Sequence, residues 1–470
     1  MRLTGERLRL SRGKVLRPGR VAFYSILIGG GLGVLWMWRS GQVQPLFLAT
    51  PTATRSAVSH AEEGLAYFSA GDMTKSIGSY QLAVELDPGD PRLWFELARI
   101  QTYSSSLLTN DFQRTSRLAE ARASADRAVE TGPESSRSHA VRALAYDWSA
   151  SIEDDQQVKD DLLTQAESSA IRGRQLDPAD PLALAFYAEI LADQQRYGQA
   201  FDVAEQAVAR DPTLMDVHRV FGTVLESNGL YRDAIQEYLA ATAISPNLTF
   251  LYLQIGANYR RLRDVAQALF YFDKAAQINS QLGIDDPIPY MAIGRTYLQE
   301  GEFIVAARNV ERALRIDPSD PFTYGFLGVV YFKGRNYESA IPVLKCAVDG
   351  CTVEETGDLL CTLIYDCEAG SEQAREHGVA VPGTALGSGS VEFYYTYGSV
   401  LTAYAGGSKY PTACADAERV FSELMQVYGD DLIVAGIVAE GRAICLNPGS
   451  NAAPGPTLTA TLELPSTPSP

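Results

Sequence analysis

One spacing constrains the fold of this chain more than any other feature: prolines that close helical stretches recur at regular intervals through most of its length. The intervals are 34 or 45 residues, with one of 72, and the prolines are Pro88, Pro133, Pro178, Pro212, Pro246 and Pro318. An alanine lies 12 positions before all but the first of them, at Ala121, Ala166, Ala200, Ala234 and Ala306. A glycine or alanine lies 24 positions before four of them, at Gly64, Ala188, Gly222 and Gly294. Self-similarity at such a period predicts stacked repeats rather than one globular core.

Stretches such as GLYRDAIQEYLAATAISP (229–246) and GEFIVAARNVERALRIDP (301–318) show the unit plainly. The unit resembles the tetratricopeptide repeat, a 34-residue helix–turn–helix, and the resemblance covers eight units over 57–354. Two units are longer, with the extra residues in 102–114 and 147–160. Because no unit buries its apolar face alone, the units must stack. The resemblance implies an all-α superhelix of about eight to nine repeats, an α-solenoid whose concave face is lined by the first helix of each unit.

The pattern weakens after residue 354. We expect 355–446 to form a degenerate ninth repeat and a C-terminal cap, since the open end of a repeat array needs an atypical cover. Residues 447–470 are rich in Pro and Thr and are expected to be disordered.

The N-terminus carries a membrane signature. A basic tail (1–20) precedes an uncharged run (21–38), followed by a linker (39–56). Eighteen helical residues span ~27 Å, enough to cross a bilayer core. The basic flank predicts a cytoplasmic N-terminus and an exported repeat domain, periplasmic or extracellular. A cleaved signal peptide is the alternative, although its apolar region is usually about 7–15 residues long.

Charge excludes one class of partner. The chain has a net charge of −17, and residues 1–40 hold eight of its 40 basic residues but one of its 57 acidic residues. The remainder is therefore strongly acidic, which argues against nucleic acid as a partner.

All six cysteines lie after residue 345, where the repeats are least regular. Export to an oxidising compartment favours disulfides. Cys414 and Cys445 flank the last predicted helices and are expected to pair, whereas Cys346, Cys351, Cys361 and Cys367 allow three pairings. Buried free thiols or a zinc site are the alternatives.

No catalytic motif stands out. The chain contains no GxxxxGK[ST], HExxH or GxSxG sequence, and it has four histidines. We expect no catalytic residue, cofactor or metal, and an enzyme site is conceivable only in 355–446.

The resemblance also implies a partner-binding groove, because in this family the second, fifth, ninth, twelfth and thirteenth positions of each unit line the concave face. In units five to eight these positions give Arg219, Phe250, Asn258, Arg260, Arg295, Phe326, Phe332 and Lys333. Guanidinium groups suit carboxylates, so the expected ligand is a peptide with acidic and aromatic or aliphatic residues. Alternatively, the arginines pair with neighbouring acids such as Glu226 and Glu300, and the phenylalanines pack between units.

These features predict a non-enzymatic, membrane-anchored scaffold that binds protein or peptide partners outside the cytoplasmic membrane. A cell-envelope enzyme or enzyme accessory, and a surface structural protein that engages glycans or itself, are the alternatives. The sequence does not specify the oligomeric state.

Overall fold

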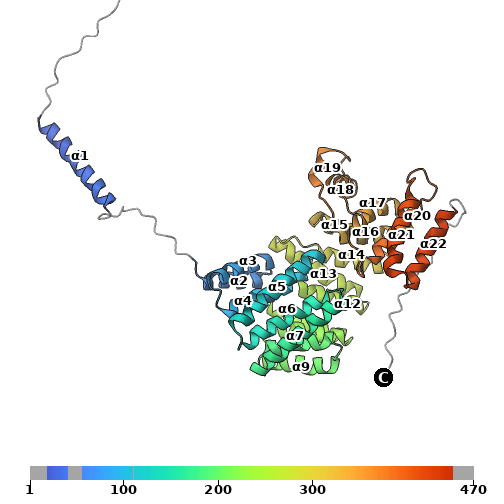
Figure 1. Ribbon diagram of the computed structural model, residues 1–470, viewed down its shortest axis with the longest axis horizontal. Helices are drawn as coiled ribbons and strands as arrows, with labels where there is room; N and C mark the ends of the chain where they lie inside the picture. Colours follow the sequence, from blue (N-terminus) through green and yellow to red (C-terminus); the bar gives the residue numbers. More distant parts are fainter. Residues whose placement is uncertain (1–17, 41–54, 110, 448–470) are drawn as a thin grey trace, which may run out of the picture. The chain divides into compact units, whose positions relative to one another are not determined.

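A computed structural model describes residues 18–40, 55–109 and 111–447 (Figure 1). The chain divides into two compact units after residue 55. The first contains helix α1 (Pro18–Arg39), of which Pro18–Met37 is long and apolar enough to cross a membrane. The predicted C-terminal tail, and most of the predicted basic tail and linker, lie outside the described residues.

The second unit is an all-α solenoid, as predicted, and its described residues contain no β-strand. Eight antiparallel helix pairs follow one another along the chain (Figure 1). They are α2 (Ala57–Ala70) with α3 (Met73–Leu86), α4 (Pro91–Ser105) with α5 (Asp111–Thr131), α6 (Ser136–Ser151) with α7 (Gln156–Leu176), α8 (Pro181–Asp193) with α9 (Tyr197–Arg210), α10 (Met215–Ser227) with α11 (Tyr231–Ile244), α12 (Thr249–Arg261) with α13 (Val265–Leu282), α14 (Ile288–Gln299) with α15 (Phe303–Ile316), and α16 (Pro321–Lys333) with α17 (Tyr337–Val348).

The small residues of the repeat let the two helices of a pair approach closely. A Cβ atom on Gly222 would lie 2.8 Å from the ring of Tyr238, and one on Gly256 would lie 2.5 Å from the ring of Phe272. In each case the large side chain stands 16 residues after the glycine, on the second helix. At these periodic glycines, the absence of a side chain on the first helix leaves room for a large side chain of the second helix.

The recurring prolines serve as hydrogen-bond acceptors between units. In five repeats the side chain six residues later binds the proline carbonyl oxygen, at 2.9–3.0 Å. These side chains are Trp94, His139, His218, Tyr252 and Tyr324. The bond fixes the turn between one unit and the first helix of the next.

The two longer units keep the same architecture. Helices α5 and α7 each have 21 residues, against 14 in α3 and α9, so much of the extra sequence lengthens the second helix.

After α17 the chain leaves the array and then returns to it. Helices α18 (Val353–Leu360) and α19 (Glu372–His377), with the intervening π-helical turn η1 (Cys361–Tyr365), form a side lobe. Helix α20 (Val391–Thr402) then packs against α16 and α17 and pairs with α21 (Ala413–Tyr428). Helix α22 (Leu432–Leu446) packs against both α20 and α21.

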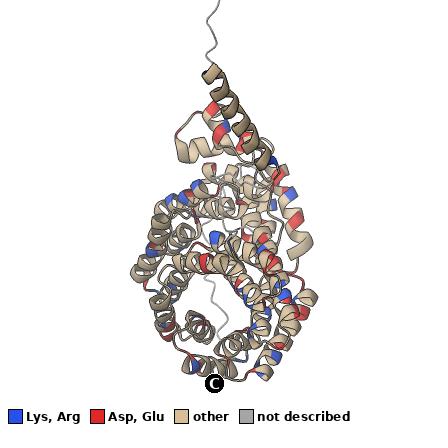
Figure 2. Cartoon of the chain, turned by 90° about the vertical axis from the view of Figure 1, so that its left-hand side faces the viewer, with Lys and Arg blue, Asp and Glu red and all other residues tan. Residues whose placement is uncertain are grey.

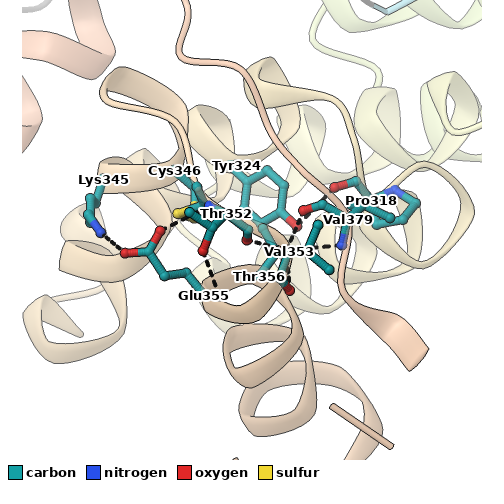
Figure 3. The surroundings of a disulfide bond; sticks show 10 residues. Pro318, Tyr324, Lys345, Cys346, Thr352, Val353, Glu355, Thr356 and Val379 are labelled. Carbon is teal, nitrogen blue, oxygen red and sulfur yellow. Dashed lines mark hydrogen bonds and ion pairs between the residues drawn. A yellow bond between two sulfur atoms is a disulfide. The ribbon is translucent and has the colours of Figure 1, made fainter. Parts of the chain in front are cut away.

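Disulfide bonding is confirmed, and the three bonds lie in this irregular region. Cys346–Cys351 joins the end of α17 to the start of α18, Cys361–Cys367 closes the η1 turn, and Cys414–Cys445 joins α21 to the end of α22. Figure 3 shows the first bond beside the start of α18, where Glu355 accepts from Thr352 N at 2.9 Å and pairs with Lys345.

The first six pairs close on themselves. Asn247 Nδ2, before α12, donates to Ser69 O in α2 at 3.1 Å, across 178 residues of sequence. Gly71, with φ +87°, permits this approach, because a Cβ there would lie 2.4 Å from Asn247 O. Figure 2 shows the helices arranged around a central axis. The apolar core largely follows the same division: one cluster runs from Phe68 to Ala275 and a second from Met291 to Val438. A small third cluster of Ala268, Phe272 and Ile293 links α13 to α14.

Candidate functional site

The inner positions of α4, α6, α8 and α10 contact one another across the closed part of the array. Arg219 on α10 makes a bidentate ion pair with Glu189 on α8, with both N–O distances at 2.7 Å. Arg99 on α4 pairs with Asp216 on α10 at 3.1 Å, and Tyr103 donates to the same carboxylate. We call Arg99, Tyr103, Glu189, Asp216 and Arg219 the buried ionic network.

The charges of this network are paired with one another, although Arg219 Nε has no hydrogen-bond partner within the described residues. Burial opposes ionisation of Asp216, yet Arg99, Tyr103 and Arg219 outweigh it and hold the carboxyl pKa below its usual value. Burial likewise disfavours the Arg219 cation, but Glu189 raises the pKa of Arg219 well above its ordinary value. A buried pair of this kind leaves no free charge for a ligand.

This arrangement corrects the expectation for three predicted groove residues. Arg219 is 3% exposed and bonded to Glu189 rather than open to a partner. Phe250 is buried, with its ring centroid 5.6 Å from that of Tyr103. Asn258 is fully buried and donates to Glu226 at 2.9 Å. The physical reason is the tight curvature of the first six pairs, which turns their inner faces on each other.

Three further predicted residues lie on or near α16. Phe326 is buried, and Phe332 is partly buried beside Tyr337. Lys333 forms an exposed ion pair with Glu392 at 3.2 Å. Exposed pairs of this kind contribute little stability, so Lys333 could exchange Glu392 for a carboxylate of a ligand at little cost.

The two remaining predictions, Arg260 on α12 and Arg295 on α14, form what we call the arginine pair. Arg260 Nη1 is buried and has no hydrogen-bond partner within the described residues. Neither guanidinium has a carboxylate within ion-pair distance in the part of the chain that the structure describes. Each cation lies over a phenylalanine ring instead, Arg260 at 5.6 Å from Phe272 and Arg295 at 5.5 Å from Phe326.

The pKa values of the arginine pair reflect an uncompensated positive charge. Burial lowers the pKa of Arg260 to about 10, and the positive charges of Arg295 and Arg261 add to that effect. Burial also lowers the pKa of Arg295, against the opposing field of Glu392. The Arg295 side chain is nevertheless exposed. A side chain that is surrounded by protein and still reaches solvent is typical of a concave surface.

The arginine pair can bind an anion, because guanidinium groups on an apolar floor favour carboxylates. The described residues hold no group of three or more His, Cys, Asp or Glu side chains that would bind a metal ion.

A stack of helix pairs with a shared core defines the α-solenoid class of scaffolds. Models of the tetratricopeptide repeat match residues 58–90 and 291–351, which lie in the first and the last two regular pairs. The chain therefore contains tetratricopeptide repeats, and it has one N-terminal helix apolar enough to cross a membrane.

Similar solved structures are distant. Cut9–Hcn1 of the APC/C hetero-tetramer aligns with a TM-score of 0.46 and 12% identity over 70% of this chain, which spans 56% of that chain. PilF of Pseudomonas aeruginosa has a TM-score of 0.35 and 17% identity over 52% of this chain and 96% of its own. A thermophilic tetratricopeptide-repeat protein of Thermus thermophilus has a TM-score of 0.36 and 17% identity over 43% of this chain and 98% of its own. No curated protein matches the sequence.

Proposed function

We propose that this protein is a membrane-anchored scaffold whose α12–α16 inner face binds an acidic segment of a protein partner. The observation that carries the proposal is the arginine pair: two neighbouring cations on consecutive first helices, without a carboxylate partner within the described residues. Two like charges are unfavourable side by side, and Arg260 is also partly buried. A ligand carboxylate between them would relieve the repulsion.

The apolar surroundings support a peptide rather than a small inorganic anion. Arg260 and Arg295 rest on the rings of Phe272 and Phe326, and Phe322 is partly exposed nearby on α16. Phe272 and Phe326 are buried and orient the two arginines, whereas Phe322 leaves part of its ring available for contact with an extended chain.

A site-specific photo-crosslinker tests this proposal in cells. We would place it at Gln299, an exposed residue four positions after Arg295 and therefore on the same face of α14. The matched control is Arg308, exposed on α15. The proposal predicts one defined protein adduct at Gln299, absent at Arg308 and absent when Arg260 and Arg295 are both changed to Glu. Equal adducts at the two positions would contradict it.

We also propose a topology in which residues 1–20 lie on the cytoplasmic side of the membrane and the repeat domain lies on the opposite side. The apolar α1 and the disulfides of the C-terminal region support this orientation. Protease added to spheroplasts should remove an epitope placed after residue 447 and spare one at the N-terminus. Protection of both epitopes would contradict the topology.

A further inference from the structure

A groove lies where the chain leaves the regular array, between α17 and the side lobe. Helix α20 takes the position beside α17 that the following first helix occupies in the regular pairs, so the space between α17 and α18 stays open. The groove has a cavity volume of about 680 Å³, which is in the usual range for ligand-binding clefts. Lys409 and Tyr410, from the loop before α21, complete its lining.

An ion pair lies at each end of this groove. Lys345 pairs with Glu355 at the end near the turn between α17 and α18, beside the first disulfide bond (Figure 3). Lys409 pairs with Glu338 near the start of α17. All four side chains are more than two-fifths exposed, and exposed pairs contribute little stability. A ligand can therefore compete with either pair at little cost.

The shape of the groove fits an extended chain. Its lining residues on α17 include positions 338 to 346, and those on α18 and η1 include 355 to 363. Such a stretch of helix is about 12 Å long, which about four residues of extended chain would cover. The middle is apolar, lined by Pro342, Leu359 and Leu363.

The wall on α17 also offers polar groups suited to a peptide backbone. Pro342 lies inside the helix and has no N–H, so the carbonyl oxygen of Glu338 lacks its helical hydrogen bond. The Ser339 hydroxyl, which lines the same wall, has no hydrogen-bond partner in the part of the chain that the structure describes. An open acceptor and a hydroxyl match the N–H and C=O groups of an extended chain.

Asp358 determines which charge the groove prefers. Of the three carboxylates that line it, Asp358 alone has no cation within ion-pair distance among the described residues. Its Oδ1 accepts from Gly370 N at 2.6 Å, and no donor from the described chain reaches its Oδ2. A negative charge without a counterion thus lies next to the apolar middle of the groove.

We propose that this groove binds an extended segment of a second protein through a lysine or arginine side chain that pairs with Asp358. An apolar side chain of the same segment packs on Leu359 and Leu363. This surface shares no residue with the arginine pair and takes the opposite charge, so the inference goes beyond the proposed function. A scaffold with both surfaces brings an acidic and a basic segment together.

Selection of short random peptides displayed on phage against the full chain in non-ionic detergent tests the groove. The variant is Asp358→Asn. The control is Glu354→Gln, an exposed acid of α18 that does not line the groove. We expect peptides with a basic residue beside an apolar one. They should bind wild type and control equally, and the variant about tenfold more weakly, in fluorescence polarisation.

A coupling measurement separates direct contact from a structural role of Asp358. Changing the basic residue of a selected peptide to norleucine should weaken binding to wild type about tenfold, with no further loss on Asp358→Asn. The Tm of that variant should not change, since the asparagine oxygen can still accept from Gly370 N. Ser339→Tyr fills the groove without changing its charge and should also weaken binding.

Equal affinity of Asp358→Asn and Glu354→Gln would overturn the inference, as would independent losses from the peptide and protein changes. A selection without any peptide that depends on Asp358 would also overturn it. The basic peptides should bind the Arg260→Glu, Arg295→Glu protein unchanged, whereas acidic peptides should not. Failure of the arginine pair and failure of this groove are thus distinguishable.

Discussion

Two regions of one inner face use arginine in opposite ways. On α10, Arg219 is buried and held by two hydrogen bonds to Glu189 of the preceding first helix. On α12, one repeat later, Arg260 has no carboxylate within ion-pair distance among the described residues and has a second arginine for a neighbour. The two helices have the same length and the same packing of glycine against a ring.

The difference between Arg219 and Arg260 therefore comes from the side chains that face them across the array, and not from the structure of the helix pair that carries them. In α4–α10 the curvature of the array brings acidic and basic side chains together across the inner face. Positions that bind ligands in other proteins of this type are therefore buried here. On α12 and α14, Arg260 and Arg295 have no carboxylate partner among the described residues and remain available to a ligand. The same repeat thus serves as a structural closure in one region and as a candidate recognition surface in the next.

The largest difference between the two regions is expected when one partner of the buried ionic network is removed. Arg219→Met leaves Glu189 buried and unpaired, and should lower the free energy of unfolding by about 3–5 kcal/mol. Arg295→Met should change it by less than about 0.5 kcal/mol, as at an exposed site. Urea unfolding followed by circular dichroism measures both.

Adding Glu189→Met to Arg219→Met provides the control for the network. The double variant should recover part of the loss, because no buried charge remains, although Trp148 Nε1 loses its acceptor. Equal losses for Arg219→Met and Arg295→Met would show that the two regions do not differ as described.

The cap extends the comparison to a region held by covalent bonds. Replacing Cys414 and Cys445 by Ser opens a loop with a sequence separation of 31 residues. The chain-entropy model gives a loss of about 3–4 kcal/mol, against about 2 kcal/mol for the short Cys346–Cys351 loop. Hydrogen exchange should accelerate in α22 and not in α10. Uniform acceleration would mean that the cap and the closed pairs unfold as one body.

Glycine substitutions test the packing that both regions share, in which a glycine of the first helix lies against a ring of the second. Gly222→Ala and Gly256→Ala each press a Cβ against a ring, and should each cost about 1–3 kcal/mol. Gly198→Ala, on α9 with nothing within 4 Å, should instead stabilise by up to about 1 kcal/mol. Thermal unfolding of the three variants decides the matter. If only Gly222→Ala lowered the free energy of unfolding, the two helix pairs would not share the same packing.

The smallest expected effect is a pH dependence in the closed region. Glu237 raises the pKa of His218 above 6.5 by accepting a hydrogen bond at 2.7 Å. A raised folded-state pKa means that the contribution is complete below pH 6.5 and is lost as pH rises through the folded value. We expect about 1 kcal/mol or less, measured as the difference between wild type and Glu237→Gln at pH 6 and pH 9. An unchanged difference would show that the protonation of His218 contributes no stability through this contact.

The sequence predicts the hairpins well, because their determinants are local. Gly222 and Tyr238 are 16 residues apart, and the period that relates them recurs along the chain. The cluster of cysteines, including Cys414 and Cys445, is visible in the same way.

The inner face could not be predicted so well, since its contacts depend on the summed curvature of several units. Arg99 and Asp216 are 117 residues apart, and no local pattern shows that they meet. The acids Glu189 and Asp216 at inner positions were the one available signal that Arg219 would be neutralised within the array. The side lobe of α18 and α19 likewise lies within the segment that the sequence predicts as a ninth repeat, because helices this short show no clear hydrophobic period.

One double variant decides whether α12 and α14 present unpaired arginines to a partner. Arg260→Glu with Arg295→Glu is compared with Arg308→Glu and Arg312→Glu, which reverse two exposed charges on α15. Affinity for pentaglutamate and Tm are measured on the same full-length preparations. We predict that the inner-face variant loses about 2 kcal/mol of binding with its Tm unchanged, while the control loses much less. Unchanged affinity with a lowered Tm would contradict the account, because it would show that these arginines stabilise the fold instead of receiving a ligand.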